Sequence, residues 1–132
     1  MGEVYSKSLL ESYIRLADKT LAESYLSFDN LMLRPAASLA YYAMFYSASA
    51  ALIKAGIRPS KTHQGVVTAF SNYYIKTGKL ENKFSRYLGR ALNVRQASTY
   101  DVTVEPNKTT VADILENAKE FVTAVKKTLG YK

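Results

Sequence analysis

Residues 35–53 carry no charged side chain, and this uncharged stretch restricts the fold more than any other feature of the sequence. It is about as long as a membrane-spanning helix. However, it contains Ser38, Ser47, Ser49, three tyrosines and many alanines, which give a poor free energy of transfer into a bilayer. We therefore expect a helix buried at the centre of a small helical bundle. Pro35 would lie in its first turn and Gly56 would end it.

Apolar residues elsewhere recur at every third or fourth position, which is the period of a helix. This pattern predicts further helices over residues 3–28, 62–77, 81–96 and about 107–129, with a short loop at 57–61 and an irregular stretch at 98–106. A chain of 132 residues without an internal repeat suits one domain with a substantial core. The predicted fold class is all-α: a single domain over residues 1–132, an up-and-down bundle of four main helices plus a shorter one.

The composition restricts the kinds of functional site that the chain can form. The chain has no cysteine and only one histidine, which excludes disulfides and thiolate nucleophiles and argues against a zinc site, so no cofactor or metal is expected. The common phosphate-loop, dinucleotide, zinc-protease and serine-hydrolase motifs are absent. The net charge of +7 favours polyanionic partners, although only weakly. Because no signal-peptide pattern is visible, the sequence indicates a cytoplasmic protein that is not attached to a membrane.

The candidate catalytic residues, Arg58 and His63, flank a loop that leads into a predicted helix. Free backbone N–H groups and the positive end of the helix dipole favour an anion there. Arg58 could bind a phosphate through two N–H groups, and Lys61 adds a positive charge. The same positive end favours neutral His63, which could then act as a general base. Alternatively, His63 shares the apolar face of Val66 and Val67 and only caps or packs the helix.

Arg95 occupies a position that the helical period assigns to the core. A buried arginine is unfavourable unless it is paired, and the next acidic residue is Asp101, which follows Tyr100. One interpretation is an Arg95–Asp101 ion pair that holds the loop against the bundle. The other is that Arg95 points into a groove and binds phosphate, with Lys61, Tyr100 and Asp101 as further substrate-binding residues.

The aromatic run at residues 41–46 also allows two interpretations. Its rings fit a core stripe, but 11 tyrosines are more amphipathic rings than one small core needs. A second stripe on the same helix is equally compatible with a self-association face, and it consists of Tyr42, Phe45, Ser49 and Ile53.

Four segments resemble small archaeal and bacterial proteins of the HEPN family (higher eukaryotes and prokaryotes nucleotide-binding). They are SLAYYAMFYSA at 38–48, KTHQGV at 61–66, KTGKL at 76–80 and RQASTYD at 95–101. Their order along the chain makes the resemblance more specific than any one segment would, and it extends from the first predicted helix into the last.

The resemblance implies a helical bundle that forms a homodimer, with the motif histidines facing each other across a two-fold cleft. Many members of the family are metal-independent ribonucleases with an Arg-x4–6-His motif. By this resemblance, Arg58 would stabilise the charge that develops on the phosphate, and His63 would assist attack by the ribose 2′-hydroxyl, with the second His63 as the acid. Small members are often encoded beside a minimal nucleotidyltransferase, and the two proteins then act as toxin and antitoxin.

The expected function is therefore RNA cleavage by a homodimeric toxin that is paired with a nucleotidyltransferase. The alternative is a non-catalytic module that binds a nucleotide or the nucleotidyltransferase itself. A third interpretation is an interaction scaffold whose positive charge serves only solubility.

Overall fold

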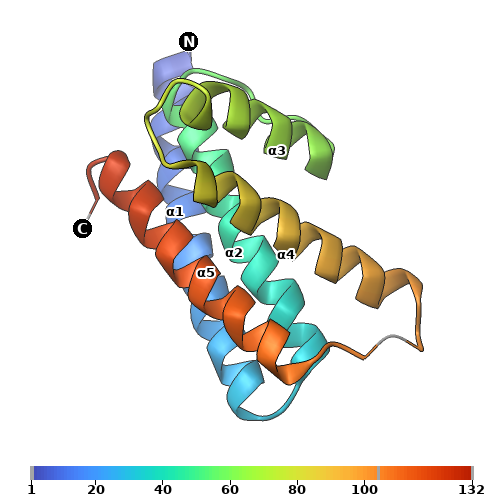
Figure 1. The fold of residues 1–132 in the computed structure, drawn as a ribbon. Coiled ribbons are helices and arrows are strands. Elements are labelled where there is room, and N and C mark those ends of the chain that lie inside the picture. Colours follow the sequence, from blue (N-terminus) through green and yellow to red (C-terminus); the bar gives the residue numbers. More distant parts are fainter. Residues whose placement is uncertain (1, 104, 132) are drawn as a thin grey trace.

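The computed structural model describes residues 2–103 and 105–131, and only the backbone of residues 2–6, 99 and 100. Its helices are α1 (Gly2–Asp29), α2 (Leu33–Lys54), α3 (His63–Phe70), α4 (Asn82–Tyr100) and α5 (Lys108–Thr128), and a π-helical turn, η1 (Ser71–Ile75), continues α3. No strand occurs in these described ranges. The predicted all-α bundle of four long helices and a shorter one is confirmed (Figure 1).

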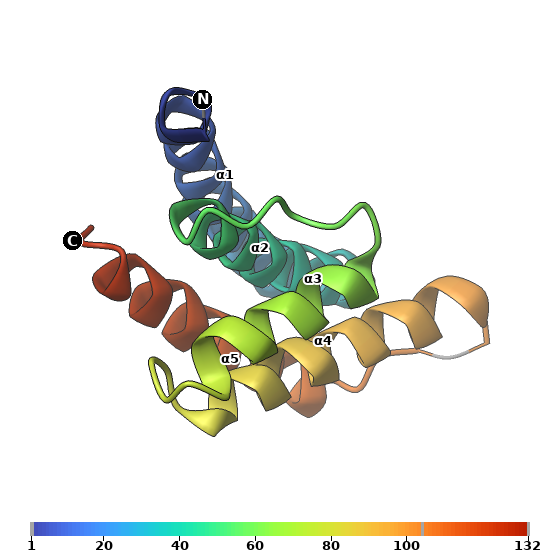
Figure 2. The ribbon, with the colours of Figure 1, turned by 90° about the horizontal axis from the view of Figure 1, so that it is seen from above.

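Helix α2 is the central element of the bundle, since it packs against α1, α3, α4 and α5. Among the described helices it alone is long and apolar enough to cross a membrane, by length and composition, but 72% of its apolar window is buried inside the bundle. The uncharged stretch is therefore a buried core helix, as predicted. Figure 2 shows α3 beside α4, with the loop that follows α2 running back along α2 to the start of α3.

Local chemistry sets the helix ends near the predicted positions. Pro35 lies in the first turn of α2, and Gly56 follows the helix with a φ of 80°, where its N–H donates to the carbonyl of Ile53 at 3.0 Å. At α5, the side chain of Asn107 accepts hydrogen bonds from the backbone N–H groups of residues 109 and 110 at 2.8 and 3.2 Å. Both boundaries confirm the sequence prediction.

Helix α4 is longer than predicted. It continues to Tyr100, whereas the sequence pattern ended it at Gln96 and made the stretch from Ser98 irregular. Arg34 of α2 accounts for the difference. Its guanidinium donates hydrogen bonds to the carbonyl oxygens of Ser98 and Val102, and it pairs with Glu105 at 3.5 Å. These tertiary contacts satisfy carbonyls at and just beyond the helix end, and they offset the low helix propensity of Thr99 in its last turn.

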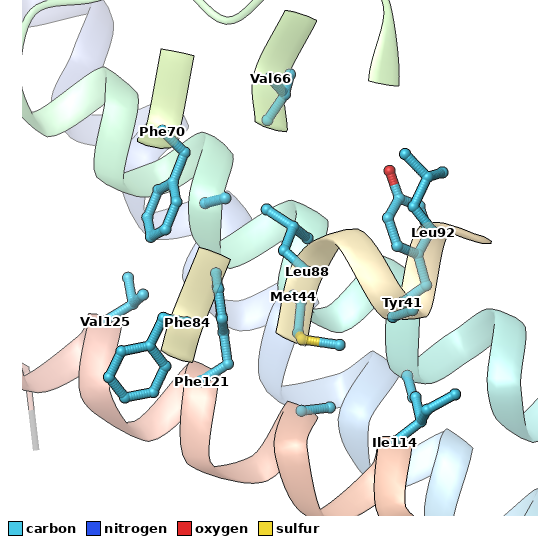
Figure 3. Packing of buried hydrophobic residues seen from close by; sticks show 14 of the residues in the cluster. Tyr41, Met44, Val66, Phe70, Phe84, Leu88, Leu92, Ile114, Phe121 and Val125 are labelled. Atoms are coloured by element: carbon cyan, nitrogen blue, oxygen red, sulfur yellow. The ribbon is translucent and has the colours of Figure 1, made fainter. Parts of the chain in front are cut away.

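The main core lies between α2, α3, α4 and α5 (Figure 3). The ring of Phe121 contacts the rings of Phe70 and Phe84 in this core. Tyr41 of α2 belongs to the same core and is 0% exposed. Its hydroxyl points away from Met44, towards the side of the bundle on which α3 lies (Figure 3).

The second stripe of α2 is not the exposed self-association face that one interpretation of the sequence proposed. Ser49 and Ile53 are buried within the chain, and Ile53 packs against Leu10 and Ile14 of α1. In a long helix at the centre of a small bundle, nearly every direction is occupied by another helix. Only the other end of the stripe, at residues 42 and 45, is half-exposed, and it contacts the candidate site.

Candidate functional site

The segment before α3 folds into a compact hydrogen-bonded turn. The hydroxyl of Thr62 caps the helix by accepting a hydrogen bond from the N–H of Gly65 at 3.0 Å. The hydroxyl of Ser60 accepts from the N–H of Thr62 at 3.1 Å and also lies 3.2 Å from the Thr62 hydroxyl. A Cβ atom on Gly65 would come within 2.1 Å of the Ser60 Oγ, so only glycine allows this close approach. The turn fixes His63 as the first residue of α3.

His63 packs against three aromatic rings of α2 and is half-buried. Its Nδ1 lies 2.7 Å from the hydroxyl oxygen of Tyr41, within a hydrogen bond. Its ring centroid lies 4.9 Å from that of Phe45 and 5.8 Å from that of Tyr42. The imidazole therefore has one nitrogen in the core and part of its ring at the surface.

Arg95 of α4 completes this cluster. Its guanidinium lies 5.2 Å from the centroid of the Tyr42 ring and 6.0 Å from that of Tyr41, in cation–π contacts. Burial, and then the positive charge of Arg95, lower the pKa of His63 below its ordinary value of 6.5. Burial also raises the pKa of Tyr41. Both groups are therefore neutral near pH 7, and burial and the charge of Arg95 are the causes of the low pKa of His63.

Arg58 and His63 lie at opposite ends of the loop within one chain. The loop starts close to Leu52, whose carbonyl accepts from the N–H of Ile57 at 2.8 Å, and it ends where His63 contacts Phe45. These two anchor positions are seven residues apart on α2, which corresponds to about 10 Å along the helix axis. The side chain of Arg58 is exposed. The contacts of the described residues join His63 to Arg95, whose charge acts on the pKa of His63.

The other predicted binding residues are more scattered. Lys61 is exposed on the loop, two residues before His63. Asp101 is exposed, and its carboxylate accepts hydrogen bonds from the N–H and hydroxyl of Thr103, which lower the pKa of Asp101. The predicted Arg95–Asp101 ion pair is not among the ion pairs of the described residues, and Arg34 holds this loop instead. Tyr100 ends α4, but its side chain lies outside the described residues.

The described residues contain no group of three or more His, Cys, Asp or Glu side chains that could hold a metal ion. What the cluster offers is a neutral imidazole at the surface, a guanidinium beside it and aromatic rings that fix both. Such a set can bind a phosphate oxygen and can donate or accept a proton at the imidazole.

Sequence reasoning missed two residues of this region, Tyr41 and Arg34. A buried tyrosine needs a hydrogen-bond partner for its hydroxyl, and Tyr41 of α2 is fully buried. This requirement is the one signal that leads from the aromatic run of α2 to a polar partner. The sequence alone does not show which tyrosine faces His63, because the contact joins residues that are 22 positions apart. Arg34 had no signal beyond its place in the first turn of an otherwise uncharged helix.

Comparison with known proteins places this chain in a known class of helical domains. Residues 10–128 match the model of the HEPN domain, and the chain belongs to the HEPN family. Two proteins of Methanocaldococcus jannaschii, both bearing the name "Putative toxin", are similar to it. One is 32% identical over 91% of this chain and 88% of its own length, and the other is 35% identical over 96% and 86%. A Thermotoga maritima protein named "UPF0332 protein" is 32% identical over 93% of this chain and 92% of its own length.

Proposed function

We propose that this HEPN protein is a toxin that cleaves RNA, and that His63 is the residue that acts at the scissile phosphate. The observation that carries the proposal is the cluster of His63 and Arg95 at the surface, with the imidazole held by three rings of α2. The toxin names of the two archaeal relatives, which align with nearly the whole chain, give independent support.

The reaction would use the 2′-hydroxyl of RNA as the nucleophile. The 2′-oxygen attacks phosphorus and gives up its proton, while the bond to the 5′-oxygen breaks and that oxygen takes up a proton. The products are a 2′,3′-cyclic phosphate and a 5′-hydroxyl. Because Nδ1 of His63 is bound to the phenol of Tyr41, the atom available to the phosphate is Nε2. Arg95 and Lys61 would bind the phosphate, since a guanidinium and an ammonium stabilise its negative charge.

The proposal includes a homodimer in the cytoplasm and a nucleotidyltransferase as its partner. A second copy would supply a second His63 and, from its own exposed loop, a second Arg58. Light scattering of the purified protein would test the dimer. A nucleotidyltransferase gene next to the gene for this chain, and a stable complex of the two purified proteins, would test the pairing.

The decisive experiment is RNA cleavage by the purified protein in the presence of a chelator. Cleavage should be lost in His63→Ala and should persist in Gln64→Ala, which changes an exposed neighbour on the same turn. Arg95→Gln and Arg58→Gln should both weaken cleavage. Arg86→Gln, at an exposed arginine elsewhere on α4, should not. Intact RNA after incubation with the native protein, or equal cleavage by His63→Ala, would refute the proposal.

The contacts that join His63 to Arg95 through the rings of α2 favour a second candidate function as well. If no dimer forms, the cluster of His63 and Arg95 could bind a nucleotide or the nucleotidyltransferase without chemistry of its own. This alternative predicts saturable binding of a nucleotide or of the partner, with loss of affinity in Arg95→Gln, by a protein that leaves RNA intact.

A further inference from the structure

The hydroxyl of Tyr41 has a single hydrogen-bond acceptor within reach in the described part of the chain. The residue is 0% exposed, so bulk water does not reach it. Within the described part of the chain, its one hydrogen-bond partner is Nδ1 of His63, at 2.7 Å. If Nδ1 carried a proton, its N–H would donate the hydrogen bond to the phenol oxygen. The phenol O–H would then be a buried donor without an acceptor. A buried donor left in that way is strongly disfavoured.

We infer that Tyr41 is a positioning residue whose O–H donates a hydrogen bond to Nδ1 of His63. This hydrogen bond holds the imidazole in the tautomer that carries its proton on Nε2. The two ring nitrogens flank one carbon, and their hydrogen-bonding directions diverge widely, so Nε2 points away from the buried phenol. The contacts with Phe45 and Tyr42 then fix the plane of the ring. Tyr41 thus decides which hydrogen-bonding group His63 presents at the surface.

The role of this tautomer in catalysis rests on the proposed function. A neutral imidazole with its proton on Nε2 is a hydrogen-bond donor, and it suits a phosphate oxygen that gains negative charge in the transition state. The general-base role expected from the sequence requires the opposite tautomer, with a free lone pair on Nε2. His63 therefore stabilises the phosphate as a neutral donor, beside the guanidinium of Arg95, and the 2′-hydroxyl gives its proton to another group, such as water.

Nitrogen NMR of ¹⁵N-labelled protein tests the inference directly, because His63 is the only histidine and its ring signals need no assignment to a residue. The two nitrogens are told apart by their couplings to the ring C–H protons, since Nε2 couples to both protons and Nδ1 mainly to one. At a pH where the imidazole is neutral, the wild type should show a protonated Nε2 and a bare Nδ1. In Tyr41→Phe, which removes only the hydroxyl, the ratio of the two tautomers should fall by about 5- to 150-fold, the population equivalent of satisfying one buried donor. Tyr42→Phe keeps a neighbouring ring without touching the Nδ1 contact and should leave the ratio unchanged.

The outcomes separate this inference from the proposed function. A wild-type protein with its proton on Nδ1, or an unchanged ratio in Tyr41→Phe, overturns the inference whether or not RNA is cleaved. The expected tautomers in a protein that leaves RNA intact support the inference and refute the proposed function. Where the wild type cleaves RNA, Tyr41→Phe should lower kcat more than it changes KM, because substrate binding by Arg95 and Lys61 is retained. Circular dichroism confirms that each variant is folded.

Discussion

Replacing Gly65 by alanine should destabilise the protein, although alanine is normally the better residue in a helix. A Cβ atom at this position would lie 2.1 Å from the Oγ and 2.5 Å from the Cβ of Ser60, and 2.7 Å from the Oγ1 of Thr62. The Cβ of Ser60 is attached to the backbone, so rotation of a side chain does not remove the clash. The turn before α3 has to move, and Thr62 then loses the geometry with which it caps the helix.

The magnitude follows from three contributions. Overpacking of this kind costs about 1–3 kcal/mol, loss of the cap costs about 1 kcal/mol, and the gain in helix propensity returns about 0.5–1 kcal/mol. We therefore expect Gly65→Ala to lower the free energy of unfolding by about 1–3 kcal/mol. The same change at Gly89, inside α4, meets no atom within 4 Å and should raise it by about 0.5–1 kcal/mol.

Denaturant unfolding and thermal melting of the two variants give the comparison. For a domain of this size, about 3–5 °C in Tm corresponds to 1 kcal/mol, so the two alanine variants should melt at least about 5 °C apart, on opposite sides of the wild type. A Gly65→Ala variant that is as stable as the wild type, or more stable, would show that the Ser60 turn does not pack as described.

Three further predictions follow from the site and the core. The pKa of His63 is lowered on folding, so the unfolded chain binds more protons below about pH 6.5 and the wild type should lose stability as pH falls through that value. His63→Gln should lack this loss in urea unfolding at pH 5.5 and 7.5, and parallel behaviour of the two proteins would contradict the shift. Arg95→Gln should raise the pKa of His63 in an NMR titration, because the guanidinium lowers it, and an unchanged pKa would rule out that cause. Tyr74→Phe should destabilise the protein by about 1 kcal/mol, since the buried Tyr74 hydroxyl donates to the carbonyl of Ala51 at 2.6 Å. Tyr87→Phe, at an exposed hydroxyl, should change stability by less than about 0.5 kcal/mol, and equal effects would contradict this account.

The fold was predictable because it depends on periodic patterns that are local in sequence. The uncharged stretch at 35–53 could only be buried, and the apolar period located the remaining helices with small errors at their ends. The one substantial error, at the end of α4, came from Arg34. Its side chain satisfies carbonyls more than 60 positions away, and no local pattern reports such a contact.

The site was predictable only in its separate parts. His63 stood out as the sole histidine at a helix start, and Arg95 as a charge at an apolar position. Their proximity depends on how α3 and α4 pack on α2. The run of similar rings on α2 hid the role of Tyr41, because a core ring and a ring that holds a histidine have the same apolar spacing.

Tyr41 is part of both the core and the candidate site. Its ring packs among the core side chains of α2 and α4, and its oxygen is hydrogen-bonded to the imidazole of His63. The position of His63 is therefore joined directly to the packing of the interior. Heating should leave the environment of His63 unchanged up to the cooperative melting transition and then abolish it in the same step.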